Sequence, residues 1–446
     1  MKQEMFSDNP GMAFLFIPMD LAYSDYDSFQ NDLDGSSRWT LEDDRDKNRY
    51  IYRYITDKMD PGKKDECLYL HYRLTEAECG RRGWGKAGTV FRIPEEDIRF
   101  QIGAVHLYAF RTKVSILAVQ IRFAEDDAKY VAAGLYYLKK VQRAALERAG
   151  AVPGNPPAET ILEAVKGLFS GPTAGALRYF PYLNEGTERA NAMSLAYAPE
   201  GADWREELHF LKNGFRTEGF AYSSRLEVED ENLITSDDYV WGVTGENLAC
   251  LILERTDHTL HRLYERFQEE YLLTYILLLH RKFDLYKILT DFGIGEQNDL
   301  QTLKAYQKLL NSYQTDYAYE RITEVPQYHR LYKKIEEKME LAELFADVME
   351  PVSELSSLRM EKAEADRDEQ ERKMERALAV LSFLAVFSAL IDCVDYLSVV
   401  AGNLPVLFHL AWSEKTLAVI QFLFSFAILV IAFWALKGIL WKRHKR

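Results

Sequence analysis

Two apolar stretches near the C-terminal end decide the fold: residues 377–401 read ALAVLSFLAVFSALIDCVDYLSVVA, and residues 416–436 read TLAVIQFLFSFAILVIAFWAL. At a helical rise of about 1.5 Å per residue, each stretch is long enough to cross the roughly 30 Å hydrocarbon core of a bilayer. The first stretch includes Asp392 and Asp395, and the second includes one amide, Gln421. Each stretch is therefore predicted to span a membrane as a helix.

The predicted membrane segment is a hairpin of two helices, 377–401 and 416–437, with an external loop, 402–415, between them. Three basic residues immediately precede the first helix and five follow residue 436, whereas the loop holds only Lys415. Because Lys and Arg are enriched on the cytoplasmic side of membrane helices, both termini, including the basic tail 438–446, are expected in the cytosol. The protein would then be a multi-pass protein of the cytoplasmic (inner) membrane. The alternative is a hairpin buried in a soluble protein.

The overall composition limits the classes of function. The 446 residues carry 55 basic and 69 acidic side chains, a net charge of -14, and this excess of negative charge argues against binding of duplex nucleic acid. Its four cysteines form no Cys-x-x-Cys pair, so neither a zinc site nor a disulfide framework is predicted. The sequence also lacks the P-loop, nucleophile-elbow and zinc-protease motifs, and we do not expect an enzyme.

The chain ahead of the membrane segment changes its pattern once, near residue 246. Residues 1–245 alternate between short strand-like runs and turn signals, which predicts a cytosolic mixed α/β domain. In 246–350 apolar residues recur three and four apart, which predicts a long helical bundle in which 271–279 is buried. The local predictions are strands at 13–17, 67–72, 105–123 (with a turn at 111–113), 192–197 and 239–243, and helices at 126–149, 158–169, 297–323 and 331–351.

A charged segment, 351–376, connects this part of the chain to the first membrane helix. From 353 onward it contains neither Gly nor Pro, and its Glu, Lys, Arg and Ala residues are strong helix formers. Oppositely charged residues four apart support the same conclusion. We expect a stalk helix that continues into the membrane, with a disordered linker as the alternative. The predicted fold class is therefore α+β: a cytosolic mixed domain, a helical bundle with a stalk, and a two-helix transmembrane hairpin.

Within the first predicted membrane helix, polar and small residues recur at four-three spacing and share one face. The residues are Leu381, Ala385, Ser388, Asp392, Asp395, Val399 and Gly402. A carboxylate in hydrocarbon is costly unless it faces water or a partner, so this face is expected to line a pore in an oligomer, with Ser388, Asp392, Asp395 and Val399 exposed to ions. The alternatives are a position in ordinary water at the outer interface and hydrogen bonds between helices.

Nearer the cytosol, three apolar residues continue roughly the same face. Met374, Leu378 and Leu381 are candidates for an apolar constriction that gates a pore by dewetting. Ordinary helix packing explains such a stripe equally well.

Several segments resemble the CorA family of divalent-cation channels, most clearly in the C-terminal half of the chain. The segments are YVWGVT (239–244), YILLLHRKF (275–283), YERIT (319–323) and LYKKI (331–335). The order of a mixed cytosolic domain, long helices, a stalk and a final hairpin is similar as well. The resemblance implies a homo-oligomer of five subunits in a lipid bilayer, a pore lined by the first membrane helix, and transport of divalent cations such as Mg²⁺ under the control of cytosolic metal binding.

One position departs from the family pattern. The family signature at the pore mouth is Gly-Met-Asn, whereas this chain has Gly402 directly followed by Asn403. Relatives that lack the signature include membrane effectors linked to type III CRISPR antiviral defence, in which a nucleotide second messenger opens the pore. The resemblance therefore leaves two functions open: a CorA-like divalent-cation channel or transporter, and a nucleotide-gated effector that permeabilises the membrane.

The sequence offers weaker candidates for ligand sites. His106 to Lys113 intermingles His, Tyr, Arg and Lys as a nucleotide pocket requires, although an amphipathic strand explains it as well. Acidic clusters offer oxygen ligands for divalent ions, but solvated loops are their commoner role, and no metal ligand is assigned. These clusters are 42–44, 95–97, 125–127, 227–231 and 237–238.

Overall fold

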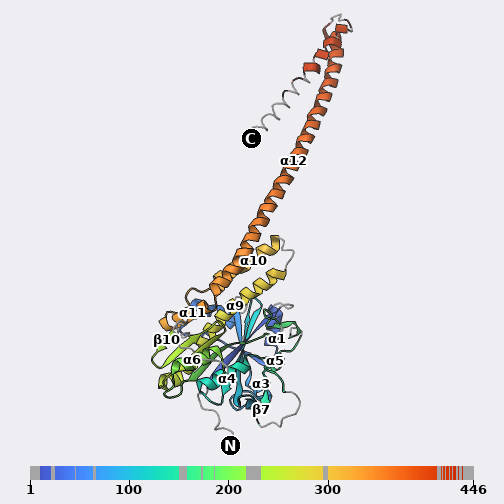
Figure 1. Cartoon of the computed structure of the whole chain (residues 1–446). Coiled ribbons are helices and arrows are strands. Elements are labelled where there is room, and N and C mark those ends of the chain that lie inside the picture. The colour runs from blue at the N-terminus through green and yellow to red at the C-terminus, as the bar shows by residue number, and fades with distance from the viewer. Residues whose placement is uncertain are drawn as a thin grey trace. The chain divides into compact units, whose positions relative to one another are not determined.

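The computed structural model describes residues 11–21, 26–45, 47–63, 67–149, 158–171, 174–184, 186–216, 233–294 and 300–408, and single positions between 413 and 434. The chain divides into two compact units, 1–356 and 357–446, and some of its elements are labelled in Figure 1. Helices and strands are both abundant, so the fold class is α+β as predicted.

The strands are β1 (Met12–Leu21), β2 (Trp39–Leu41), β3 (Tyr69–Leu74), β4 (Phe91–Ile93), β5 (Ile98–Phe110), β6 (Val114–Phe123), β7 (Glu147–Arg148), β8 (Leu177–Tyr179), β9 (Asn191–Tyr197), β10 (Leu233–Ser236), β11 (Tyr239–Val243) and β12 (Asn247–Ile252). The α-helices are α1 (Tyr26–Asp34), α2 (Arg53–Thr56), α3 (Glu76–Arg82), α4 (Ala128–Leu138), α5 (Ile161–Lys166), α6 (Trp204–Asn213), α8 (Tyr264–Gln268), α9 (Glu270–Ile294), α10 (Leu300–Ser312), α11 (Pro326–Lys338) and α12 (Leu341–Phe408). Short 3₁₀ turns lie at Asp57–Met59, Pro61–Lys63 and Ala174–Ala176, and π-helical turns at His258–Leu263 and Tyr313–Tyr317.

All described strands belong to one sheet. Its main order is β10-β11-β12-β9-β1-β6-β5-β3-β2, with β4 and β8 paired to β5 and β1, and β7 paired to β4. Among these pairs, β9 with β12 is parallel and the others are antiparallel. A parallel pair needs a crossover connection, and α6 lies in the crossover between β9 and β12.

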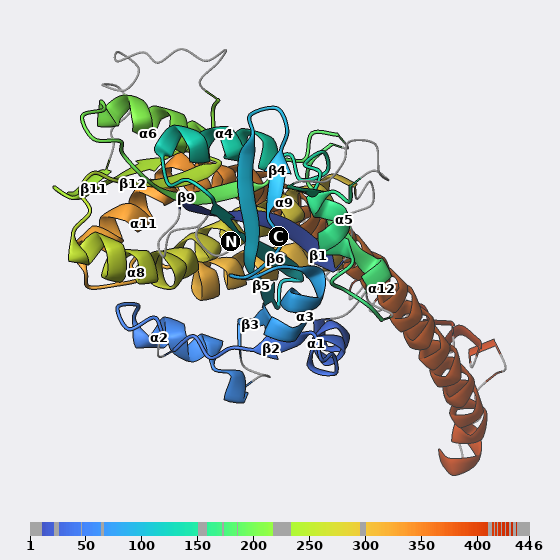
Figure 2. The ribbon, with the colours of Figure 1, turned by 90° about the horizontal axis from the view of Figure 1, so that it is seen from below.

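Strand β1 runs through the middle of the first unit, and all ten of its residues are buried. Its odd-numbered residues pack with α1, α4, α5 and α6 in one hydrophobic core. Its even-numbered residues Met12, Phe14 and Phe16 pack with α8, α9 and α11 in a second core. Because successive side chains of a strand point to opposite faces, the sheet is the middle layer between two layers of helices, as Figure 2 shows.

The hairpin predicted within 105–123 is confirmed. Strands β5 and β6 pair antiparallel and are joined by residues 111–113, where Lys113 has a φ of 69°. The strands predicted at 13–17, 67–72, 192–197 and 239–243 are present as β1, β3, β9 and β11. Strand β12 was missed, because its buried run, NLACLI, has the continuous apolar character of a strand covered on both faces rather than an alternating pattern.

Several helix boundaries differ from the prediction. Helix α4 ends at Leu138 rather than at 149, since the chain turns there and then forms the short strand β7. The helix predicted over 331–351 is broken: α11 ends at Lys338, Glu340 has a φ of 54°, and α12 begins at Leu341. Pro351, expected to end a helix, lies inside α12.

The helices expected to form a separate bundle at 246–350 pack largely against the sheet. Tyr271 to Leu279 in α9 are buried as predicted, but they contact residues of β1, β6, β9 and β11 as well as α11. A smaller core joins α9 to α10 and the start of α12 through Leu285, Leu310 and Val348. The sheet and these helices therefore form one compact unit, which extends to residue 356.

The second unit, 357–446, contains most of α12, including residues 357–376 of the predicted stalk. The stalk is helical, and α12 continues to Phe408, seven residues into the predicted loop 402–415. Many positions of 409–446, including parts of the second predicted span and the whole basic tail, lie outside the described residues. Among the residues that were described, no helix contains a stretch long and apolar enough to cross a membrane, so both spans stay predictions.

A buried acid on α9 makes the stability of the first unit depend on pH. Burial raises the pKa of Asp284 from 3.8 to about 7, although the nearby Lys287 ammonium lowers it. The folded protein therefore holds this proton over a pH range in which the unfolded chain has released it. The free energy of unfolding consequently falls as the pH rises from about 4 to about 7.

We predict that Asp284→Asn melts at a higher temperature than the wild type at pH 8, with the difference shrinking toward pH 4. The amide of asparagine is neutral at every pH. The free energy of unfolding of the variant therefore does not fall between about pH 4 and about pH 7, as that of the wild type does. Differential scanning calorimetry at pH 4, 6 and 8 measures this. The control is Asp291→Asn on an exposed residue of the same helix, and a pH-independent difference between Asp284→Asn and wild type would contradict the account.

Candidate functional site

The first unit contains a cavity of about 600 Å³ between the sheet and its helices. Strands β3, β5 and β6 form its floor, and α3, the loop after α3, and α8 contribute its walls. The cavity lies where β5 is bulged, between the stretch paired with β4 and the stretch paired with β3. Cavities of this size hold small molecules in other proteins.

The β5 bulge places polar groups in the cavity. The register of β5 on β6 shifts between Ile102 and Val105, and the backbone N–H of Ala104 donates to Oε1 of Gln120 at 3.1 Å. A Cβ on Gly103 would lie 2.3 Å from that same oxygen, so a larger residue at this position would displace the Gln120 amide. Nε2 of Gln120 donates to Oε1 of Gln268 in α8 at 2.8 Å. The bulge therefore connects the sheet to the helix that covers it.

Two histidines and an aspartate form a hydrogen-bonded chain at one wall. Nδ1 of His71 lies 2.7 Å from Oδ1 of Asp44, and Nε2 of His71 lies 2.9 Å from Nδ1 of His106. The His71 ring also stacks on Tyr108, with centroids 4.3 Å apart and planes 8° from parallel. The chain is thereby held rigidly on β3 and β5.

The hydrogen bonds assign the protons of this chain. Burial, together with the nearby His71, Arg73 and Lys47, lowers the pKa of His106 well below 6.5, so its ring is neutral at pH 7. If Asp44 accepts from Nδ1–H of His71, then Nε2 of His71 accepts from Nδ1–H of His106. Nε2 of His106 is then an acceptor, and no described residue donates to it.

Three cationic side chains line the cavity without an ion-pair partner among the described residues: Arg73, Lys86 and Arg122. Arg73 and Lys86 are exposed, but Arg122 is only 9% exposed. A fourth cation, Lys47, forms an ion pair with Glu42. The unpaired positive charge of the cavity thus comes from Arg122, a mostly buried residue, and from two exposed cations.

Carboxylates also face the cavity. Glu76 and Glu265 are exposed, whereas Glu269 is half-buried, and burial raises the pKa of its carboxyl group. The site is therefore not uniformly positive. To a bound ligand, the site offers the Arg122 guanidinium for an anionic group and several hydrogen-bond acceptors for N–H or O–H groups.

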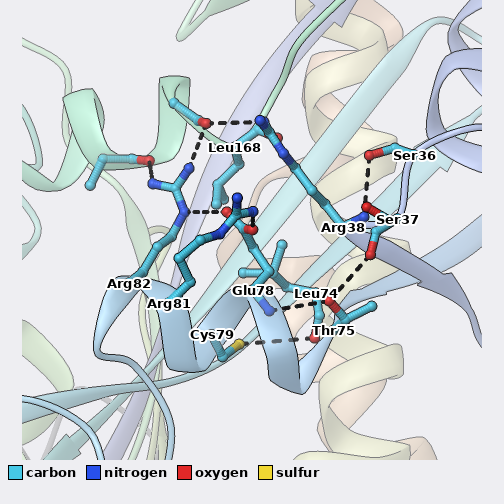
Figure 3. A network of polar contacts seen from close by, with 12 residues as sticks. Ser36, Ser37, Arg38, Leu74, Thr75, Glu78, Cys79, Arg81, Arg82 and Leu168 are labelled. Carbon is cyan, nitrogen blue, oxygen red and sulfur yellow. Dashed lines mark hydrogen bonds and ion pairs between the residues drawn. The ribbon is translucent and has the colours of Figure 1, made fainter.

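Helix α3, one wall of the cavity, is fixed by the polar network in Figure 3. The Oγ1 atom of Thr75 accepts from the N–H of Glu78 at 3.3 Å and caps the first turn. Nε of Arg82 donates to the buried Glu78 carboxylate at 2.7 Å, and its Nη2 donates to the carbonyl of Gly167 at 2.6 Å. Nη1 of Arg38 donates to the carbonyl of Leu168, the residue after Gly167, at 3.1 Å. The Arg82 contact anchors α3 to the end of α5, and the Arg38 contact joins the same end to the segment before β2.

The nucleotide segment predicted at 106–113 contributes only in part. His106 and Tyr108 line the cavity, but Arg111 does not, because its Nε donates to the carbonyl of Cys67 at 2.6 Å. Sequence reasoning missed His71 and Arg122. No local motif marks either residue, since they join the site only through the register of three strands.

Several carboxylates of the described acidic clusters contact other groups of the protein. In 42–44 each carboxylate contacts a basic side chain or His71, Asp126 pairs with Arg255, and Asp127 caps α4. The cluster at 227–231 lies outside the described residues. Among the residues described, no three His, Cys, Asp or Glu side chains gather to hold a metal ion.

The predicted pore residues all lie on α12. Ser388, Asp392, Asp395 and Val399 are exposed on the chain, as are the gate candidates Met374, Leu378 and Leu381. For Gly402 and Asn403 the structure describes the helical backbone but not the surroundings. A ring of these residues requires several copies of the chain, so the roles assigned to them stay predictions.

Comparisons of this chain with protein-family profiles, with curated proteins and with solved structures found no match.

We predict that Thr75→Ala lowers the free energy of unfolding of the first unit by about 1 kcal/mol, because it removes the side-chain acceptor at the start of α3. Chemical denaturation of the full chain, followed by tryptophan fluorescence, measures the change. Thr75→Ser keeps the hydroxyl group and is expected to lose much less. Equal losses in the two variants would show that packing, not the cap, holds α3.

Proposed function

We propose that this chain is a CorA-like, homo-oligomeric membrane channel or transporter for divalent cations such as Mg²⁺, with the Asp392 and Asp395 face of α12 lining the pore. The observation that carries the proposal is the arrangement of α12: one continuous helix presents Ser388, Asp392, Asp395 and Val399 on a single face. Aligned in a ring of subunits, these carboxylates would concentrate cations.

The apolar surface of α12 supports this proposal. Leu378, Leu381, Phe383 and Val386 are each more than two-fifths exposed on the single chain. At about 100° per residue they point in different directions around the helix, so no one packing partner covers them all. A helix that is apolar all round is normally covered by lipid or by other helices. If the predicted hairpin is inserted into a bilayer, lipid covers part of this surface, and further copies of α12 around the pore cover the rest.

A second candidate function is favoured by the cavity of the first unit. A membrane effector of antiviral defence would need a site for a nucleotide signal, and this cavity combines Arg122, which has no ion-pair partner among the described residues, with several hydrogen-bond acceptors. In that case the channel would stay closed until the signal binds.

We predict that the purified full chain in liposomes conducts Mg²⁺, and that Asp392→Asn with Asp395→Asn reduces the flux to less than about a tenth of wild type, because the rings lose their charge. A dye sealed in the liposomes reports the entry of Mg²⁺. Each variant is measured with and without added nucleoside phosphates, so that a ligand-gated channel is detected as well.

The matched control is Glu361→Gln with Glu364→Gln, which removes the same charge from exposed positions of the charged segment of α12. This variant should conduct as the wild type does. Undiminished flux through the aspartate double variant would place the pore elsewhere. A wild type that conducts no ion under any ligand or voltage condition would rule out a channel.

A further inference from the structure

The hydrogen-bonded chain of Asp44, His71 and His106 ends at the cavity. Asp44 and His71 are buried, whereas His106 is half-buried and lines the cavity. The His106 ring also packs against the His71 ring, with centroids 5.1 Å apart, and against the Phe14 ring, at 6.1 Å. Because Nδ1 of His106 is used in the chain, Nε2 is the ring nitrogen that is available to a molecule in the cavity.

The chain lets His106 accept a proton although protein surrounds most of its ring. Nδ1–H of His106 donates to Nε2 of His71, and Nδ1–H of His71 donates to Asp44. When Nε2 of His106 takes a proton, the proton on its Nδ1 can pass to His71. The positive charge then lies on the ring that is 2.7 Å from the buried carboxylate. A carboxylate stabilises the imidazolium of hydrolytic triads in the same way.

A cation lies beside this base. Arg73 of β3 is the cross-strand partner of His106 in an antiparallel pair, so their Cβ atoms are about 5 Å apart on one face of the sheet. Arg73 is exposed, lines the cavity and has no ion-pair partner among the described residues. Its guanidinium can therefore contact a molecule that is bonded to His106. A base next to such a cation can activate water and stabilise the negative charge that develops.

The number of rings at the cavity restricts the reaction. In acyl transfer, the attacking water and the leaving group are bonded to one carbon, so a single imidazole can take a proton from the first and return it to the second. In displacement at phosphorus, the two groups lie in line on opposite sides, which favours a separate acid and base. His71 has both nitrogens bonded within the chain, and the Glu269 carboxyl group has no hydrogen bond with a described residue that would fix it. The site therefore fits acyl transfer.

We propose that the cavity hydrolyses a small carboxylic ester, with His106 as general base, Arg73 as the group that stabilises the oxyanion, and His71 and Asp44 as positioning residues. The volume of about 600 Å³ is that of a small-molecule site. This activity goes beyond the proposed channel function and does not depend on ion conduction. No hydrolase sequence motif marks the group, because the register of β3 on β5 assembles it.

The reaction needs only water as a second substrate. Nε2 of His106 removes a proton from water while the water oxygen bonds to the carbonyl carbon, and the electron pair of the C=O double bond moves to the oxygen, next to Arg73. The carbonyl then re-forms, and the bond between the carbon and the leaving oxygen breaks. His106 returns its proton to that oxygen. The products are a carboxylic acid and an alcohol, and the chain is unchanged.

The test uses the full chain purified in detergent and follows the release of p-nitrophenolate. The probes are p-nitrophenyl acetate, p-nitrophenyl butyrate and bis(p-nitrophenyl) phosphate. At least one carboxylic ester should be hydrolysed, and His106→Gln should lower kcat/KM at least about a hundredfold, a usual contribution of a general base.

The matched control is His261→Gln, which removes an exposed imidazole that also has an aspartate partner, Asp257, and lies outside the cavity. This variant should hydrolyse the ester as the wild type does. Three results would overturn the proposal: no hydrolysis of either carboxylic ester, hydrolysis of the phosphate diester alone, or equal rates in wild type and His106→Gln.

Two further variants test the residues around the base. Arg73→Met changes an exposed side chain and should lower kcat about a hundredfold with the melting temperature unchanged, whereas Arg73→Lys keeps the charge and should recover part of the rate. His71→Gln still accepts from His106 but cannot take its proton, so kcat should fall at least about tenfold. Wild-type rates in Arg73→Met or His71→Gln would contradict the roles assigned to these residues.

The pH profile distinguishes His106 from a surface imidazole. Burial, together with the nearby His71, Arg73 and Lys47, lowers the pKa of His106 well below 6.5. The base is therefore unprotonated at pH 6.5, and kcat/KM should stay constant from pH 8 to about 6.5 and fall only in more acidic solution. A rate that has fallen to half at about pH 6.5 would assign the hydrolysis to an exposed histidine and contradict the proposal. The other charged and titratable groups of the cavity near His106 are Asp44, Tyr108, Glu265 and Glu269.

Discussion

The structure of the first unit depends on the burial of both faces of β1. A strand with two buried faces forces the sheet to be covered by helices on each side, and the chain supplies α4 and α6 for one face and α9 and α11 for the other. The one charged residue of β1, Asp20, is fully buried and is held by Arg178 of β8, at 2.5 Å, and by Lys287 of α9. That pair of contacts ties the central strand to an edge strand and to the long helix.

The position of the cavity follows from this arrangement. Helix α8 directly precedes α9, so the packing of α9 on the sheet also fixes α8 above β5 and β6. The bulge at Gly103 then creates the space between them, and Gln120 bridges it to Gln268. The polar groups of the cavity are therefore arranged by backbone pairing and helix packing, and they do not come from one continuous segment. Preorganisation of this kind is typical of sites that recognise a specific ligand.

The sequence predicted those parts of the fold that have a local signal. The β5–β6 hairpin has two apolar runs around a turn, and the charged segment of α12 has strong helix formers without a breaker. Strand β12 and the packing of α9 on the sheet were not predicted, because a continuously apolar run has no period that distinguishes its partners. His106 was identified within a candidate nucleotide segment. Its neighbours His71 and Arg122 were not, since strand register brings them together across the sheet.

Thiol accessibility along α12 tests the central claim most directly. Single cysteines are introduced into a chain whose native cysteines are replaced by serine, the protein is placed in liposomes, and a membrane-impermeant thiol reagent is added. We predict reaction at 388, 392, 395 and 399, which share the proposed pore face, and protection at 383, 386 and 390, which lie on the opposite face of the helix and face lipid or neighbouring helices. Equal reaction at all seven positions would show that α12 is surrounded by water, and the proposal of a membrane pore would then be wrong.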